Sequence, residues 1–397
     1  MQFIDNIPVW GSPVDEGALS QMRTCARTAD RCAMMADHHK GYAVPIGGVV
    51  AYRDRISPSG VGFDIACGNK AILTDATADE VRARISKIMD DIWNTVSFGI
   101  GRKNREEVDH PLFDDAAWNV LAGIEVKHFA TLKDMARAQL GTVGSGNHYV
   151  DIFADEQDRV WIGVHFGSRG LGHRTATHFL EAAGASDGMD VEPCILMADS
   201  QLGADYLEGM RLGGLYAYAG RDWVCSRVAK ILGASILDEV HNHHNFAWRE
   251  EHGGEQLWVV RKGATPAFPG QRGFVGGSMG DVSVIIEGIE NADASHSLYS
   301  TVHGAGRVMG RKQATGTFDR KTGVVKRPGL VTRQMMREWI APMKVELRGA
   351  GVDEAPQCYK RLPEVLAEHA DSIRVLHTLT PLGVAMAGEN EFDPYKD

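Results

Sequence analysis

The sequence contains no hydrophobic run long enough to cross a membrane. Its longest apolar stretches include residues 47–52 and 282–286, whereas a membrane-spanning helix needs roughly 18 apolar residues. The N-terminal segment 1–8 carries Asp5 and has neither a basic leader nor an apolar stretch of secretory length. We therefore expect a cytoplasmic protein that does not enter a membrane.

Cysteine is also scarce. The six cysteines form no CxxC pair: Cys25, Cys32, Cys67, Cys194, Cys225 and Cys358. This spacing excludes a zinc ribbon and fits a reducing compartment. Positive charge is in deficit as well, because 42 Lys and Arg face 52 Asp and Glu, for a net charge of -10. Any binding to a nucleic acid must therefore depend on a local basic patch.

Common nucleotide-binding motifs are missing. The sequence has no Walker A motif, no GxGxxG between a strand and a helix, and no Lys-x-Asp-Gly. It also lacks repeats of solenoid length and low-complexity linkers. We therefore predict one intertwined α+β domain over residues 1–397, with a polar and frayed tail at 388–397.

Glycine and histidine are what the chain has in quantity, with 45 and 16 residues. Apolar periodicity predicts helices over 78–96, 114–138, 173–183, 201–232 and 358–372, and strands over 43–52, 70–74, 148–153, 160–165, 257–260 and 282–286. Most glycine- and histidine-rich runs fall at the ends of these strands, where rigid scaffolds commonly present functional side chains. The clustering therefore indicates a site built from loops.

Some of these loop residues offer donors for a transition metal. Asp64 and Cys67 lie three positions apart among glycines, so a carboxylate and a thiolate can meet in one turn. The alternative is a β-turn with a buried cysteine. The complete candidate set is Asp64, Cys67, His148, His165 and His244. Mixed O, N and S donors suit Zn or Mn better than Mg or Ca, and a bridging thiolate would allow two ions. We expect His241 and His243 to be structural or to support the ligands.

A second group of runs suggests phosphate chemistry. His303 opens the run HGAGR, where an imidazole can attack phosphorus while Arg307 and glycine N–H groups stabilise the developing charge. The run 276–280, followed by Ser283, resembles a phosphate cradle. Plain glycine-rich turns are the alternative in both cases. Basic side chains in or beside these runs are either phosphate contacts or solvated groups: Arg169, Arg261, Lys262, Arg307 and Arg311.

Taken in order, these runs resemble one known family. GVGFDIACG, GTVGSGNH, HFGSRGLGH, HHN, RKGA, GSMG and HGAGRVMGR occur in the order of the RtcB family of RNA ligases, with matches from about residue 30 to residue 311. The resemblance implies the RtcB fold, which is a single α+β domain. It also implies dependence on Mn²⁺ and the use of GTP.

The resemblance assigns a role to each matching residue. Cys67 would bridge two Mn²⁺ ions held by two pairs of ligands, with Zn²⁺ able to replace Mn²⁺ in the purified protein: Asp64 with His148, and His165 with His244. His303 would be guanylylated, Arg307 would stabilise charge beside it, and Arg169 would bind the RNA phosphate. Residues matching nucleotide contacts are Asn147, His148, Asp151, Asn245, Gly276, Gly277, Ser278, Met279, Ser283, Gly304, Ala305 and Gly306.

The implied reaction joins an RNA 3′-phosphate or 2′,3′-cyclic phosphate to a 5′-hydroxyl, in tRNA splicing or RNA repair. GTP would guanylylate His303, the guanylate would pass to the 3′-phosphate, and the 5′-hydroxyl would displace GMP. An archease-type activator is a further implied partner. Two alternatives stay open, which are an enzyme that guanylylates or cleaves RNA ends with weak ligation, and a non-catalytic RNA-binding paralogue.

Three departures from the family pattern identify the chain as a divergent paralogue. Asp151 stands where the family's GNHF-x-E run ends in Glu, and Gly276 stands where a proline usually precedes GSM. The run 384–388 reads VAMAG, whereas the family ends in Val-Lys-Gly with a lysine on the guanine nucleotide, and Lys396 is the candidate nearby. These changes bear on nucleotide preference more than on the chemistry.

Overall fold

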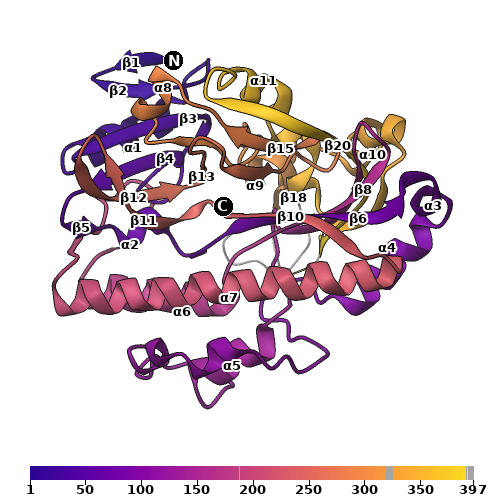
Figure 1. Cartoon of the computed structure of the whole chain (residues 1–397), viewed down its shortest axis with the longest axis horizontal. Coiled ribbons are helices and arrows are strands. Elements are labelled where there is room, and N and C mark those ends of the chain that lie inside the picture. The colour runs from indigo at the N-terminus through magenta and orange to yellow at the C-terminus, as the bar shows by residue number, and fades with distance from the viewer. Residues whose placement is uncertain (187, 319–324, 390, 392–397) are drawn as a thin grey trace.

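Two sheets carry most of the strands in the computed structural model, which describes residues 1–186, 188–318, 325–389 and 391 (Figure 1). The first sheet has the order β1 (Gln2–Ile4), β2 (Ile7–Val9), β3 (Arg31–His39), β4 (Ile46–Tyr52), β12 (Glu255–Lys262) and β11 (Asn245–His252). The second has the order β10 (Ile236–His243), β6 (Gly68–Thr77), β8 (Arg159–Phe166), β7 (Tyr149–Ala154), β20 (Ile373–Gly388), β15 (Ser283–Gly288) and β14 (Arg272–Val275). β19 (Glu346–Ala350) pairs with β20 in parallel.

The chain crosses from the second sheet to the first at His244, which separates β10 from β11. Shorter strand pairs are β13 (Ala264–Pro266) with β16 (Ser300–Val302), β17 (Gly316–Phe318) with β18 (Val325–Pro328), and β5 (Arg55–Ile56) with β9 (Leu196–Met197). His244, the residue at which the chain crosses, therefore lies where the ends of both sheets come together.

Helix α7 (Gln201–Leu232) runs along one side of the molecule, with α5 (Leu132–Gln139) beyond it (Figure 1). Its start is capped by Ser200, whose hydroxyl accepts from the Gly203 N–H, and it ends at Gly233 in the left-handed conformation. Val224 and Val228 pack with Ile72 of β6 in one apolar core. Helix α7 therefore packs against the second sheet.

The remaining helices are short and lie around the sheets. They are α1 (Glu16–Ala26), α2 (Pro58–Val61), α3 (Ala78–Ala83), α4 (Ile85–Thr95), α6 (Arg169–Ala182), α8 (Ala292–His296), α9 (Arg311–Thr315), α10 (Arg333–Ile340) and α11 (Leu362–Ala367). No helix in the described ranges is long and apolar enough to span a bilayer.

The mixed helix and strand content confirms the predicted α+β class, and the predicted helix 201–232 is found with the same bounds. The prediction of one helix over 114–138 is wrong. Two 3-10 turns, Pro111–Asp114 and Ala116–Asn119, bury Phe113 and Trp118, and α5 begins only after Thr131. A capping box between Thr131 and Asp134 fixes that start.

Other predicted helices are shorter or divided. The segment 78–96 breaks at Arg84, where φ is -131°, and 358–372 contains only the helix Leu362–Ala367. The helix predicted at 173–183 begins earlier, at Arg169. All six predicted strands overlap observed ones, whereas β20, with 16 residues, was not predicted.

Candidate functional site

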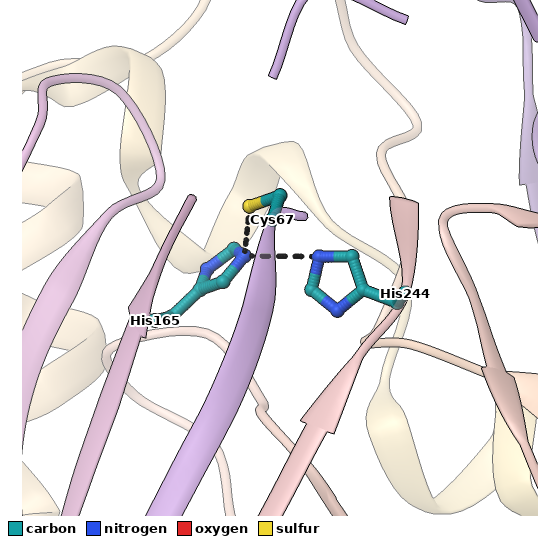
Figure 2. Close-up of side chains that lie close together, drawn as sticks. All are labelled: Cys67, His165 and His244. Carbon is teal, nitrogen blue, oxygen red and sulfur yellow. Dashed lines mark hydrogen bonds between the residues drawn. The ribbon is translucent and has the colours of Figure 1, made fainter. Parts of the chain in front are cut away.

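The structure brings the five proposed metal donors together as two groups that share one sulfur. Asp64, Cys67 and His148 form the first group, and Cys67, His165 and His244 form the second, with the donor atoms of each within 4.8 Å of one another. Figure 2 shows the rings of His165 and His244 turned toward each other below the Cys67 sulfur. The Cys67 thiol is therefore the one donor that the two groups share.

Within each group, the separations from the Cys67 sulfur and between the two histidines of the second group are close to those between neighbouring ligands of one ion, whereas Asp64 Oδ2 and His148 Nε2 are closer, at 2.9 Å. His165 Nε2 lies 3.2 Å from Cys67 Sγ and 3.3 Å from His244 Nε2, and His148 Nε2 lies 3.5 Å from the same sulfur. Tetrahedral metal–nitrogen and metal–sulfur bonds place neighbouring donors about 3.3–3.6 Å apart. The residues therefore fit a site for transition-metal ions.

Backbone hydrogen bonds position the shared cysteine. The Cys67 N–H donates to the Asp64 carbonyl at 3.0 Å, and the His244 N–H donates to the Cys67 carbonyl at 2.8 Å. Ala66 has a φ of 60°, so the turn that aims Asp64 and Cys67 inward uses a left-handed residue. Gly167 is required nearby, because a Cβ there would lie 2.1 Å from Asp64 Oδ1.

The charges around the donors favour an ionised carboxylate and a protonated thiol in the protein alone. Burial would raise the pKa of Asp64, but the charge and hydrogen bond of His148 hold it below its usual range. Burial and the Asp64 carboxylate raise the pKa of the Cys67 thiol. The His165 Nδ1–H donates to the Asn147 carbonyl at 3.0 Å, which leaves its Nε2 lone pair toward Cys67.

A fully buried arginine supports the donors from α7. Arg221 Nη1 donates to the carbonyls of Ala66 at 3.1 Å and Phe166 at 2.5 Å, each next to a proposed ligand. Its Nε and Nη2 donate to His241 Nε2 at 2.8 Å and His243 Nδ1 at 2.9 Å. The two histidines therefore hold Arg221, as expected of supporting residues.

His303 lies beside the metal donors and is held by an acid that the sequence did not reveal. Its ring centroid is 4.8 Å from that of His244. The His303 Nδ1–H donates to Asp37 Oδ2 at 2.6 Å, and the His303 backbone N–H donates to the same oxygen at 3.0 Å. Burial would raise the pKa of Asp37, but His303 keeps it below its usual range.

These residues open into a cavity of about 290 Å³, close to the lower end of the volumes that hold small ligands. Its predicted lining residues are Asp64, Cys67, Asn147, Asp151, His165, His244, Asn245, Gly276, Gly277, Ser278, Met279, His303, Gly304, Ala305, Gly306 and Arg307. Residues that were not predicted also line it: His39, Tyr149, Glu354 and Tyr359. The cavity therefore joins the metal donors to both glycine-rich runs.

Three predicted residues lie behind the cavity wall. His148 is among the metal donors, whereas Ser283 Oγ accepts from the Gly277 N–H at 3.0 Å and so braces the glycine loop. The Arg169 guanidinium donates to Thr142 Oγ1 at 3.4 Å and to the Gly99 carbonyl at 3.3 Å. The Arg169 guanidinium is thus bonded to one side-chain hydroxyl and one backbone carbonyl of the protein.

Fewer basic side chains line the cavity than the sequence suggested. Arg307 and Arg311 line it, and both form ion pairs with Glu354. Arg261 is fully buried elsewhere and pairs with Glu250 at 2.7 Å. Lys262, its neighbour on β12, donates to the Ser59 carbonyl at 3.2 Å. Arg261 therefore does not line the cavity and is neither a phosphate contact nor a solvated group, because its guanidinium is used in a buried ion pair.

One of the departures from the family pattern, Gly276, lies against the side chain of Tyr149. A Cβ at Gly276 would lie 2.1 Å from the Tyr149 hydroxyl, and Tyr149 stands at the Phe of the family's GNHF run. The extra oxygen therefore occupies space that a proline at 276 would need.

The C-terminal strand closes the cavity with apolar side chains. Val384 and Met386 of β20 line it, and Val384 is the register partner of Asp151. Asp151 is 6% exposed, and burial raises its carboxyl pKa well above the usual range.

The tail predicted at 388–397 is described in part. Glu389 pairs with Arg333, and Glu391 pairs with Arg102. Lys396 lies outside the described residues.

Comparison with known proteins gives one consistent result. The family described as tRNA-splicing ligase RtcB matches residues 18–387. The RNA-splicing ligase RtcB of Escherichia coli (strain K12) is 32% identical, over 94% of this chain and 96% of its own. The tRNA-splicing ligases RtcB of Thermococcus kodakarensis and Archaeoglobus fulgidus are each 31% identical, over 89% of this chain and 86% of their own.

Proposed function

Because the chain belongs to the RtcB family, we propose that it is an RNA ligase that uses GTP and Mn²⁺. It joins an RNA 3′-phosphate or 2′,3′-cyclic phosphate end to a 5′-hydroxyl end through a guanylate on His303. The observation that carries the proposal is the position of His303, whose ring lies 4.8 Å from that of the metal donor His244. A nucleophile and a metal-binding group are thus neighbours in one cavity.

The protein prepares His303 as a nucleophile. Because the Nδ1–H donates to Asp37, the other nitrogen, Nε2, keeps its lone pair for attack on the α-phosphorus of GTP. An N–P bond forms and pyrophosphate leaves. Asp37 then stabilises the positive charge that develops on the ring, as a buried carboxylate does for an imidazole base. Divalent ions on the two donor groups would supply a Lewis acid for the phosphoryl oxygens.

The glycine-rich runs provide the phosphate environment. Gly304, Ala305 and Gly306 follow the nucleophile along the cavity wall, and Arg307 comes next. In this proposal the backbone N–H groups of Ala305 and Gly306 and the guanidinium of Arg307, which also pairs with Glu354, stabilise charge on the transferring phosphoryl group. The guanylate then passes to an RNA 3′-phosphate, and the 5′-hydroxyl displaces GMP to leave a 3′,5′-phosphodiester.

The first experiment tests the covalent step. Incubation with α-labelled GTP and Mn²⁺ should leave acid-labile label on the protein, and His303→Ala should abolish it. His296→Ala, on the short helix α8, is the matched control and should label normally. Equal labelling of His303→Ala and the wild type would refute the proposal. Parallel reactions with ATP and dGTP test nucleotide preference, because Val384 and Met386 form the wall next to Asp151.

The second experiment tests the overall reaction with a broken tRNA stem-loop that carries a 2′,3′-cyclic phosphate and a 5′-hydroxyl. Efficient joining is expected. Accumulation of guanylylated or dephosphorylated 3′ ends without joining would instead identify an end-modifying enzyme of the same family. Addition of an archease-type protein to the same reaction tests whether an activator is needed.

A further inference from the structure

Strand β3 ends with three titratable residues that face in different directions. Asp37 holds His303, and His39 lines the cavity. His38, between them, turns away, because its Nδ1–H donates to the Met35 carbonyl at 2.7 Å and its Nε2 accepts from the Asp15 N–H at 3.1 Å. The strand thus supplies Asp37, which is buried behind His303, and His39, which lines the cavity, and the proposed steps use only Asp37.

The tautomer of His39 is set by the backbone. Its Nδ1 lies 3.1 Å from the Asp37 carbonyl oxygen. A carbonyl oxygen only accepts, so the neutral ring carries its proton on Nδ1 and its lone pair on Nε2. Among the described residues, none hydrogen-bonds to His39 Nε2. A proton acceptor is therefore available at the cavity wall.

The surroundings keep this ring neutral. Burial lowers the pKa of His39 to about 4, and the charges of His303 and Arg307 act in the same direction, while Asp37 opposes them. Lys360 is the other cation at this strand end, where its Nζ donates to the His38 carbonyl at 3.2 Å. At neutral pH the imidazole is thus unprotonated, and its Nε2 can accept a proton but has none to donate.

We propose that His39 is a further catalytic residue, which accepts the proton of the 5′-hydroxyl when the RNA ends are joined. The proposal rests on the proposed ligase function. The 5′-oxygen forms a bond to the phosphorus of the guanylylated 3′ end, the bond from that phosphorus to the GMP oxygen breaks, and the hydroxyl proton passes to His39 Nε2. GMP leaves with the electron pair, so charge and atoms balance.

The experiment separates the two covalent steps. Step one is measured as label transferred from GTP to the protein. Step two is measured with RNA that already carries a 3′-phosphate–guanylate anhydride, mixed with RNA that has a 5′-hydroxyl. His303→Ala should fail in step one and still join the preformed anhydride. His39→Gln and His39→Ala should label normally and lose joining by about 100- to 10,000-fold, the usual contribution of a general base.

Two further measurements separate catalysis from folding. The rate of joining by the wild type should fall at acid pH as one group is protonated. The rate of joining by His39→Gln should not show this fall. Added imidazole should restore joining by His39→Ala. The matched control, His38→Gln, should lower the melting temperature and leave the ratio of the two rates unchanged.

Joining of the anhydride by His39→Gln at the wild-type rate would overturn the proposal, as would an equal loss in both steps. The ligase proposal fails in a different way, because then the wild type itself neither labels nor joins.

Discussion

Asp37 Oδ2 lies 2.6 Å from His303 Nδ1, although the two residues are 266 positions apart in the chain. The same oxygen accepts the backbone N–H of His303 at 3.0 Å and that of Gly304 at 3.4 Å. One buried carboxylate thus fixes both the ring and the backbone of the glycine-rich turn. The orientation of the proposed nucleophile therefore depends on a residue of the first sheet.

Asp37→Asn should slow guanylylation of His303 by about 100- to 10,000-fold, because an amide neither fixes the tautomer nor stabilises the charged ring. Single-turnover labelling with GTP measures the rate, and circular dichroism checks that the variant folds. Asp79→Asn, which removes a carboxylate exposed on α3 and paired with Arg82, is the control. Labelling of Asp37→Asn at the wild-type rate would show that the contact is only structural.

Cys67 belongs to both donor groups, whereas His148 belongs to one. Cys67→Ala should therefore reduce Mn²⁺ binding from two ions to none, and His148→Ala should reduce it to one. Equilibrium dialysis with elemental analysis measures the stoichiometry. Cys32→Ala, at a cysteine outside the cavity, should keep both ions. Retention of two tightly bound ions by Cys67→Ala would contradict the bridging role.

The sequence could mark the candidate metal donors because each lies near a strand end, most of them in or beside a glycine-rich run. Asp64 and Cys67 belong to one such turn, and His165 is the penultimate residue of β8. Local composition was enough to mark these positions. Their convergence on one sulfur could be inferred from the family resemblance but not from spacing, because it depends on the order β10-β6-β8-β7, which makes strands far apart in the sequence neighbours in the second sheet.

Asp37 and Arg261 show where local reasoning failed. Asp37 lies two residues before the end of β3 and has no glycine-rich run of its own, so its partner could be identified only from the fold. Arg261 belongs to the run RKGA, whose basic pair gives no sign of what it contacts, and neither Arg261 nor Lys262 lines the cavity. The Arg261 guanidinium meets Glu250 in the interior, a partner that only the pairing of β11 with β12 reveals.

The contact between Gly276 and Tyr149 predicts an interaction between two substitutions. Gly276→Ala would place a Cβ 2.1 Å from the Tyr149 hydroxyl, so it should destabilise the protein by about 1–3 kcal/mol. Tyr149→Phe removes that oxygen and should recover part of the loss. Urea unfolding of the two single variants and the double variant gives the coupling energy, expected to be about 1 kcal/mol. Additive effects would mean that the loop moves aside.

His369 links the segment after α11 to the strand that carries Asp37. Its Nε2 accepts the Ala36 N–H at 3.2 Å, and its ring stacks on Trp10 at 5.4 Å between centroids. The side chain is 1% exposed, and burial lowers its pKa from 6.5 to about 4. The neutral ring is therefore the form that the folded protein holds.

A lowered histidine pKa makes the folded state less stable in acid. The stability from the neutral His369 ring is fully present above pH 6.5 and is lost as the pH falls toward 4, because the unfolded chain binds the proton first. Protonation of this one histidine in the unfolded chain should lower the free energy of unfolding by about 2 kcal/mol between pH 7 and pH 5.

His369→Gln keeps an acceptor for the Ala36 N–H and has no titrating ring. It should therefore show a smaller fall in unfolding free energy over that interval than the wild type, as measured by urea unfolding at each pH. His296→Gln, at the edge of α8, should retain the wild-type pH dependence. If the unfolding free energy of His369→Gln fell with pH as steeply as that of the wild type, the His369 ring would become protonated without loss of its contacts.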